Sequence, residues 1–466
     1  MISISLRGFG WTHAGRNRPA LKDIDLEIPA GSRVLLSGNS GSGKSTLAAA
    51  IAGVLGGDEE GTAQGSIVLN DGTHKVAPGT TIPVGLVLQD PDSQVIAARV
   101  GDDVAFGCEN LGIPREEIWS RVEQALAMVG LDVPLDHPTA HLSGGQKQRL
   151  ALAGVMAMGA GLIVLDEPTA NLDPVGAREV VAAVKGLVDS THATLIVIEH
   201  NGAVWEGVLE KAIELADGHL AAEDSFAAVA ARREFKNLPT ARPVGEFTPT
   251  MWCENLLTRC GPPRNIEIPG GASTVVTGPN GAGKSTWMLT MAGLLPERAG
   301  EIGMSTDIAQ GLVPPPRRWK SADLAQRIGC VFQNPEHQFV TRTVREELEI
   351  GPKVMRKHGW NGRGSGDIDK LVQRLRLEHL LDANPFTLSG GEKRRLSVAT
   401  ALVSSPNIVF FDEPTFGQDP QTFLELVNLL RELALSGVAI VSVTHDPHFI
   451  AALGDHHITI TAGESA

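Results

Sequence analysis

Two glycine-rich segments, each placed directly after a short apolar run, restrict the possible fold of this chain more than any other feature. Residues 38–46 read G-N-S-G-S-G-K-S-T after the apolar run 34–36, and residues 278–286 read G-P-N-G-A-G-K-S-T after the run 274–276. Glycines in such a loop let backbone N–H groups turn toward one centre, and a helix starting at the lysine adds the positive end of its dipole. The sequence therefore predicts two strand, loop and helix units that bind phosphate.

The residues of each loop are expected to divide the contacts to a polyphosphate among them. Lys44 and Lys284 reach the β- and γ-phosphates as point charges, while the hydroxyl groups of Ser45 and Ser285 coordinate Mg²⁺. The other loop residues complete the phosphate contacts: Gly38, Asn39, Ser40, Gly41, Ser42, Gly43, Thr46, Gly278, Pro279, Asn280, Gly281, Ala282, Gly283 and Thr286.

Other landmarks recur in the same order in both halves of the chain. The offset between equivalent residues is 240 between Lys44 and Lys284 and 246 between Glu167 and Glu413. Offsets this constant indicate that one unit is duplicated, and the small drift places the additional residues in loops.

The duplication predicts the domain organisation. A chain of 466 residues is too long for one core, so we expect one domain over 1–235 and a second over 251–466. The segment 236–250 contains several prolines and little apolar periodicity, and it is the expected linker.

Apolar patterning predicts an α/β fold in each half. Apolar residues within 115–129 recur at helical spacing, which indicates a helical subdomain between the phosphate loop and residue 143. Short apolar strands over 162–165 and 195–198 flank a helix near 175–188, as expected of a parallel sheet. Further strands are expected at 2–6, 21–28, 408–411 and 438–443.

A third motif, present in both halves, identifies the family that the chain resembles. Residues 142–149 read L-S-G-G-Q-K-Q-R and residues 388–395 read L-S-G-G-E-K-R-R. A serine is a good helix N-cap and the two glycines expose backbone N–H groups, so the following helix can present donors to a phosphate. Together with the phosphate loops, this motif resembles the ATP-binding cassette (ABC) family.

The resemblance implies the fold class and the way in which ATP is bound. It implies two tandem P-loop NTPase domains, each with a mostly parallel sheet core, an antiparallel β subdomain and a helical subdomain. ATP would lie between the phosphate loop of one cassette and the Ser-Gly-Gly of the other, so the two cassettes would pair as a pseudo-dimer. The implied ATP contacts are Ser143, Gly144, Gly145, Gln146, Ser389, Gly390, Gly391 and Glu392.

Pairs of acids follow two of the predicted strands. Asp166-Glu167 and Asp412-Glu413 each end a buried apolar run, where charges are costly unless they meet a cation or water. Asp166 and Asp412 are expected to hold Mg²⁺ through water, and Glu167 and Glu413 to polarise the water that attacks the γ-phosphate.

Several further residues enter the site by resemblance alone. His200 and His445 would contact the γ-phosphate and help to hold the attacking water, as catalytic residues. Asp173 and Asp419 match the family loop that reaches the other cassette, although the second copy reads F-G-Q-D where the first reads A-N-L-D. Gln89 and Gln333 would contact both ATP and Mg²⁺.

The segments around these glutamines point to a branch of the family. Residues 88–94 read L-Q-D-P-D-S-Q and residues 332–338 read F-Q-N-P-E-H-Q. A second Gln five residues after the first, followed by D-V-A-F-G-C-E-N-L-G over 103–112, resembles the energy-coupling-factor importers of vitamins and metal ions. A generic glutamine loop with a coincidental second Gln is the alternative.

That branch implies partners and a location. An integral membrane coupling subunit would dock on the glutamine loops, and a separate membrane subunit would bind the solute, so the solute stays open. Asp92 and Glu336 could meet arginines of the coupling subunit or remain solvated. We expect the chain on the cytoplasmic face of the membrane, because its longest apolar stretch, 151–165, stops at charged residues and its first residues lack a signal-peptide core.

Two other functions remain as alternatives. The first is the tandem ATPase of a sugar importer, which would lack the second Gln. The second is a soluble tandem cassette acting on ribosomes or DNA, which the net charge of −14 and the short linker disfavour, so no nucleic-acid partner is expected.

The adenine contact is predicted to differ between the two sites. The chain contains no Tyr, and Trp11, 33 residues before Lys44, stands where the family places an aromatic residue that stacks on adenine. Aligning the strands of the second unit puts Thr258 at that position. Because base stacking on an aromatic ring adds affinity, the second site is expected to bind ATP more weakly.

Overall fold

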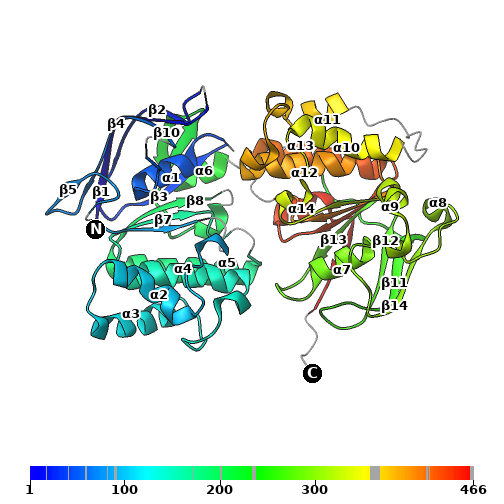
Figure 1. Cartoon of the computed structure of the whole chain (residues 1–466), viewed down its shortest axis with the longest axis horizontal. Coiled ribbons are helices and arrows are strands. Elements are labelled where there is room, and N and C mark those ends of the chain that lie inside the picture. Colours follow the sequence, from blue (N-terminus) through cyan, green and yellow to red (C-terminus); the bar gives the residue numbers. More distant parts are fainter. Residues whose placement is uncertain are drawn as a thin grey trace. The chain divides into compact units, whose positions relative to one another are not determined.

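The computed structural model describes the chain except residues 17, 40, 58–59, 81, 89–91, 170–171, 200–201, 233–237, 357–367, 416–417, 419 and 462–466. The chain divides into two compact units, Met1–Glu234 and Phe235–Ala466 (Figure 1). Each unit contains a parallel sheet, an antiparallel sheet and a set of helices, which confirms the predicted fold class.

The first unit is built on two sheets. The antiparallel sheet has the order β2-β1-β4-β5, with β1 Ser3–His13, β2 Leu21–Ile28, β4 Gly61–Asn70 and β5 Lys75–Val76. The second sheet has the order β10-β9-β3-β8-β7-β6 and is parallel from β9 to β6. Its strands are β3 Arg33–Gly38, β6 Val84–Val87, β7 Leu162–Asp166, β8 Thr194–Ile198, β9 Lys211–Ala216 and β10 His219–Ser225.

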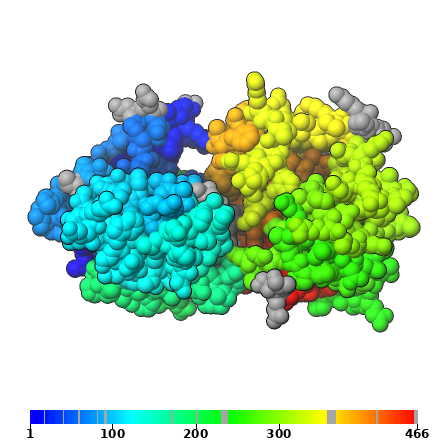
Figure 2. Space-filling model, turned by 60° about the horizontal axis from the view of Figure 1, so that its bottom comes forward, coloured from blue at the N-terminus to red at the C-terminus, as the bar shows by residue number. Residues whose placement is uncertain are grey.

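Helices cover both faces of this parallel sheet. They are α1 Lys44–Ala52, α2 Val100–Asn110, α3 Arg115–Met128, α4 Gly144–Met158, α5 Pro174–Thr191 and α6 Phe226–Arg232. The helices α2, α3 and α4 pack together as the helical subdomain, and Figure 2 shows its cyan residues as one continuous layer on the near face of this unit. The α3 helix buries Ile118, Val122 and Ala125 in agreement with the predicted spacing.

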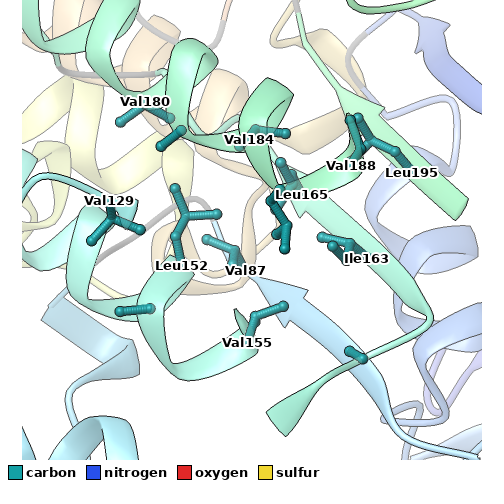
Figure 3. Packing of buried hydrophobic residues seen from close by; sticks show 14 of the residues in the cluster. Val87, Val129, Leu152, Val155, Ile163, Leu165, Val180, Val184, Val188 and Leu195 are labelled. Atoms are coloured by element: carbon teal, nitrogen blue, oxygen red, sulfur yellow. The ribbon is translucent and has the colours of Figure 1, made fainter. Parts of the chain in front are cut away.

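The core of the first unit lies between the sheet and its helices. Val87, Ile163, Leu165 and Leu195 project from β6, β7 and β8 toward residues of α4 and α5 such as Leu152 (Figure 3). Strands buried on both faces read as continuous apolar runs, which is why these short runs could be identified in the sequence.

The second unit repeats this plan, with fewer strands among the residues that the structure describes. Its antiparallel sheet has the order β12-β11-β14, with β11 Pro249–Leu257, β12 Arg264–Pro269 and β14 Ala299–Met304. Its parallel sheet has the order β15-β16-β17-β13-β18, with β13 Ser273–Thr277, β15 Ile328–Val331, β16 Ile408–Asp412, β17 Ala439–Val443 and β18 His456–Thr459. Its helices are α7 Lys284–Met291, α8 Thr306–Ala309, α9 Ser321–Arg327, α10 Val344–Arg356, α11 Ile368–Arg374, α12 Gly390–Leu402, α13 Pro420–Leu435 and α14 Pro447–Leu453.

The segment expected to be the linker packs on the second unit where it is described. Ala241 N–H donates to the carbonyl of Ala451 at 2.9 Å, and Val244 N–H donates to that of Asp455 at 3.0 Å. Arg431 and Asp455 form a buried ion pair at 2.6 Å under this segment. The strand β11 then begins at Pro249, inside the expected linker.

Among the helices of the described ranges, none combines the length and the apolar character required to cross a bilayer.

Candidate nucleotide sites

The first phosphate loop connects β3 to α1 and curls around its lysine. Lys44 is 7% exposed, and its Nζ donates to the carbonyl groups of Gly38 and Asn39 at 3.0 Å each. A Cβ atom on Gly38 would lie 2.3 Å from the carbonyl oxygen of Leu215, so only glycine fits where β3 meets the loop. The loop therefore holds one positive charge at the N-terminus of a helix, as a polyphosphate site requires.

The second phosphate loop has the same construction between β13 and α7. Lys284 Nζ donates to the carbonyl groups of Gly278 at 2.7 Å and Pro279 at 2.9 Å. A Cβ atom on Gly278 would lie 2.0 Å from the carbonyl oxygen of Ile460. The described residues of the two loops therefore share one backbone geometry, and phosphate binding by them stays a prediction.

The predicted catalytic glutamates adopt the same unusual backbone conformation in both units. Glu167 and Glu413 each have φ of 50°, in the left-handed region that non-glycine residues rarely occupy. Their N–H groups donate at 2.9 Å to the carbonyls of Ile198 and Val443 on the neighbouring strands. This strained conformation at the same position in both units is of the kind that clusters at functional sites.

The acids of the second unit lie next to its phosphate loop. Burial raises the pKa of Asp412, while a hydrogen bond from the Ser285 hydroxyl and the charges of Arg394 and Lys284 lower it. Burial, followed by the neighbouring Asp412 charge, raises the pKa of Glu413 to about 7. Because a hydroxyl and a carboxylate oxygen meet here beside a lysine, the predicted ligands Ser285 and Asp412 fit an oxygen-preferring Mg²⁺ ion.

The glutamine loops are closed by their second Gln. In the first unit, the Gln94 side chain accepts from Leu88 N–H at 2.9 Å and donates to the Leu88 carbonyl at 3.0 Å. In the second unit, Gln338 accepts from Phe332 N–H at 3.0 Å and donates to the Cys330 carbonyl at 3.1 Å. In both copies, the side chain of the second Gln thus holds the backbone that precedes the first Gln of the loop.

The Ser-Gly-Gly motifs begin the helices α4 and α12 as expected, but their caps differ. Ser143 N–H donates to Gln146 Oε1 at 2.9 Å, and the Ser143 hydroxyl accepts from Gln146 N–H at 3.3 Å. In the second copy, the N–H and the hydroxyl of Ser389 both donate to Glu392 Oε2 at 2.8 Å. A carboxylate therefore accepts a hydrogen bond from the serine hydroxyl in one copy only.

Comparison with known proteins decides the family. The family model described as "ABC transporter" matches residues 21–170 and 263–416, more than half of the chain. The chain belongs to the ABC transporter family. As two ABC ATP-binding domains, it is an ATPase.

Relatives in this family extend over nearly the whole chain. "Putative HMP/thiamine import ATP-binding protein YkoD" of Bacillus subtilis (strain 168) is 33% identical and covers 97% of this chain and 88% of its own length. A "Putative ABC transporter ATP-binding protein" of Methanosarcina mazei is 29% identical, over 99% of this chain and 94% of its own length. The archaeal ribosome recycling factor aABCE1 shares the fold, with a TM-score of 0.64 at 19% identity over 97% of this chain and 87% of that chain.

In this ABC ATPase, Trp11 is not exposed, as stacking on adenine would require. It is 5% exposed, and a Cβ atom on Gly61 would lie 2.4 Å from its ring, so the ring packs over the neighbouring strand. His13, two residues further along β1, is exposed, and its Nε2 lies 3.4 Å from Thr46 Oγ1 at the start of α1. Residues 11 and 13 lie on the same face of β1, because side chains alternate along a strand. His13, at the end of the strand, is the one that reaches the phosphate loop.

The second unit has no aromatic residue at the matching position. Gly8 and Asn255 both interrupt their strands with left-handed φ values of 52° and 47°, and Trp11 and Thr258 each follow three residues later. The alignment of Thr258 with Trp11 therefore holds, and Thr258 is itself 1% exposed.

Other predicted residues take structural roles in the described part of the ABC ATPase. The Asp173 carboxylate caps α5 by accepting from Val175 N–H at 3.1 Å and Gly176 N–H at 2.8 Å. Glu336 forms an ion pair with Lys393 at 2.6 Å within the same unit. Contacts of Asp173 across the cassettes, and the pairing of each loop with the other Ser-Gly-Gly, stay predictions. Ser40, Gln89, His200 and Asp419 lie outside the described residues, as does the Asp92 side chain, while His445 is half-buried just after β17.

Three buried charged residues near these sites were not predicted. Glu199, which is 5% exposed, accepts from Thr169 Oγ1 at 2.8 Å and from Trp205 Nε1 at 3.4 Å. Arg394 donates to the carbonyls of Phe332, Gln333 and Asp412, and burial lowers its pKa to about 10. Arg264 lies under the second phosphate loop. The sequence signal for Arg394 was its replacement of Gln148, one of two differences between the copies of the motif, the other being Glu392 for Gln146.

Proposed function

We propose that this ATPase energises import of a micronutrient, such as a vitamin, a vitamin precursor or a transition metal ion, through a membrane complex of the energy-coupling-factor type. The observation that carries the proposal is the repeated closure of both glutamine loops by Gln94 and Gln338, the residues on which the resemblance to that branch depends. The name of the YkoD relative refers to HMP/thiamine import, which also supports a role in micronutrient import.

The proposed chemistry is hydrolysis of ATP at the phosphate loop of each unit. Bound Mg²⁺ would neutralise charge on the β- and γ-phosphates, held by Ser285 and Asp412 in the second unit. Lys284 would hold the transferred phosphoryl group, and Glu413 would accept a hydrogen bond from the attacking water and orient it. A carboxyl group with a pKa of about 7 is suited to gaining and losing a proton near neutral pH.

The proposed partners are an integral membrane coupling subunit and a substrate-binding membrane subunit, with the chain at the cytoplasmic face of the membrane. We place the docking surface of the coupling subunit on the glutamine loops. The Glu336 carboxylate is held by Lys393, so an arginine of the partner would have to share or displace that bond.

Two alternatives remain within the same family. A sugar importer is disfavoured by the closure that the second Gln provides in both units. A ribosome-associated function has no support beyond the aABCE1 fold at 19% identity, and the net charge of −14 opposes binding to a nucleic acid.

The experiment is purification of the full-length chain from membranes of its source cells, with mass spectrometry of the proteins and solute that accompany it. We expect two membrane proteins and one micronutrient. The variant Gln94→Ala with Gln338→Ala should lose these proteins but still bind ATP. Glu116→Gln, on the exposed side of α3, is the matched control and should keep them. Recovery of ribosomal proteins, or of a sugar-binding partner, would overturn the proposal.

A further inference from the structure

One backbone carbonyl of the phosphate loop is hydrogen-bonded by different donors in the two units. In the first unit, the carbonyl of Ser42 accepts from the N–H of Gly218, at 3.2 Å. In the second unit, Ala282 occupies the same loop position, and its carbonyl accepts from Nη2 of Arg264 at 2.7 Å. A guanidinium group has therefore taken the place of a backbone N–H group.

In the first unit, the donor belongs to a turn of the sheet. Gly218 lies in the turn that joins β9 to β10, and its carbonyl also accepts from Lys22 N–H at 2.8 Å. In the second unit, the described part of the sheet ends after β18, and the Arg264 side chain donates to the Ala282 carbonyl. A buried carbonyl without a donor is costly, so this hydrogen bond stabilises the loop.

Two changes in sequence let Arg264 reach the loop. Arg264 pairs with Leu256, which follows the left-handed Asn255, just as Ile24 pairs with Phe9 after the left-handed Gly8. Arg264 thus stands at the core position that Ile24 fills in the first unit. A Cβ atom on Gly261 would lie 2.1 Å from Nη2 of Arg264, so the absent side chain of Gly261 provides the space.

The charge of Arg264 is buried, and among the described residues it has no carboxylate partner. The residue is 8% exposed, and its acceptors are the carbonyls of Ala282 and, at 3.3 Å, Cys260. No carboxylate of the described residues forms an ion pair with it, and burial lowers its pKa. A buried cation of this kind is costly in the empty protein, and an anion bound in the loop would offset that cost.

We propose that Arg264 is a positioning residue of the second nucleotide site alone: its guanidinium fixes the carbonyl of Ala282, and its charge strengthens binding of the polyphosphate. This inference rests on the proposed nucleotide site in the loop 278–286. In the first site the neutral N–H of Gly218 donates to the equivalent carbonyl, so the two sites differ in how their nucleotide affinity depends on salt concentration and on the number of phosphate groups in the nucleotide.

The test measures nucleotide affinity in the full-length chain that carries Lys44→Ala, which leaves the second site. Arg264→Met should raise the Kd for ATP about tenfold, raise that for ADP less, and flatten the dependence of the ATP Kd on salt concentration. Arg264→Lys should keep the salt dependence, because it keeps the charge. Arg264→Gln, a neutral donor, replaces Arg264→Met if the latter does not fold. The matched control is Ile24→Met with Lys284→Ala, which should leave the Kd of the first site within about twofold.

The results of this test distinguish an error in the proposed nucleotide site from an error in the inference about Arg264. If Lys284→Ala added to Lys44→Ala leaves ATP binding intact, the nucleotide site itself is wrong. If the added Lys284→Ala change abolishes ATP binding, the site is supported and the neutral variants of Arg264 decide the inference. The inference is overturned if these variants keep the Kd of the parent. It is also overturned if they weaken binding of ATP and ADP equally and leave the salt dependence unchanged, because Arg264 then has only a structural role.

Discussion

Glu392 accepts hydrogen bonds from both the hydroxyl and the N–H of Ser389, each at 2.8 Å, whereas Ser143 meets the neutral Gln146. This carboxylate places a negative charge at the helix end that, in the predicted pairing of the cassettes, would contact the γ-phosphate. A single like charge near a phosphate corresponds to about 1 kcal/mol at a partly exposed site, or a several-fold change in affinity.

We therefore expect Glu392→Gln to lower the Kd for ATP about three- to tenfold in the Lys284→Ala background, which leaves the loop of Lys44, the one that the predicted pairing of the cassettes would join to Ser389. The reciprocal Gln146→Glu change, in the Lys44→Ala background, should raise the Kd by a similar factor. Titration with ATP at low salt measures both Kd values. If each variant binds ATP as tightly as its own Lys→Ala parent, the charge argument is contradicted.

The double variant Glu167→Gln with Glu413→Gln should bind ATP but lose most of its hydrolysis. Both residues have the strained φ of 50° that aims the side chain, and the amide keeps the shape while losing the acceptor charge. Phosphate release should fall at least about a hundredfold, and near-normal turnover would show that another group polarises the water.

Stability of the second unit should depend on pH through Glu413. The pKa of this carboxyl is raised from 4.5 to about 7, so between those values the folded chain binds more protons than the unfolded chain. The free energy of unfolding is therefore highest near the acid end of this window and falls as pH rises, by about 2–3 kcal/mol. Asp412 acts in the same direction because burial also raises its pKa.

Urea denaturation at pH 5 and pH 7.5, without nucleotide or Mg²⁺, measures this dependence. Glu413→Gln has no proton to lose and should show a smaller decrease between the two values. Identical decreases in the variant and the parent would place the titration elsewhere.

His13 is expected to supply the adenine contact that was assigned to Trp11. In the Lys284→Ala background, His13→Ala should weaken ATP binding about threefold to tenfold, since the exposed ring lies at the start of α1. Trp11→Phe, which keeps a buried ring, should leave the Kd unchanged, whereas Trp11→Ala should destabilise the first unit by about 3–5 kcal/mol. A Kd that responds to Trp11→Phe and not to His13→Ala would restore the original assignment.

The Arg431–Asp455 pair should hold the segment 238–248 on the second unit. Its side chains are 9% and 4% exposed, and the Asp455 carboxylate also accepts from Arg242 N–H at 2.6 Å. Asp455→Asn leaves a buried cation without its counter-ion and should cost about 3–5 kcal/mol. Protease cleavage within 238–248 should then become faster, while Glu432→Gln, at an exposed pair on the same helix, should change neither property.

The sequence by itself determined the family, the duplication and the chemistry of the two loops. The phosphate loops, the acids Asp166 and Asp412 and the Ser-Gly-Gly motifs are short and local, and their function depends on backbone conformations that only those residue types allow. The parallel strands were also readable, because burial on both faces leaves a continuous apolar run.

Only the tertiary structure decided which side chains are available to a ligand. Trp11 and His13 are two residues apart in one strand, yet packing against Gly61 buries the first and leaves the second exposed. The bond from Arg264 to Ala282 depends on the pairing of β11 with β12. Burial and such donors are set by segments distant in the chain, so a local pattern cannot specify them.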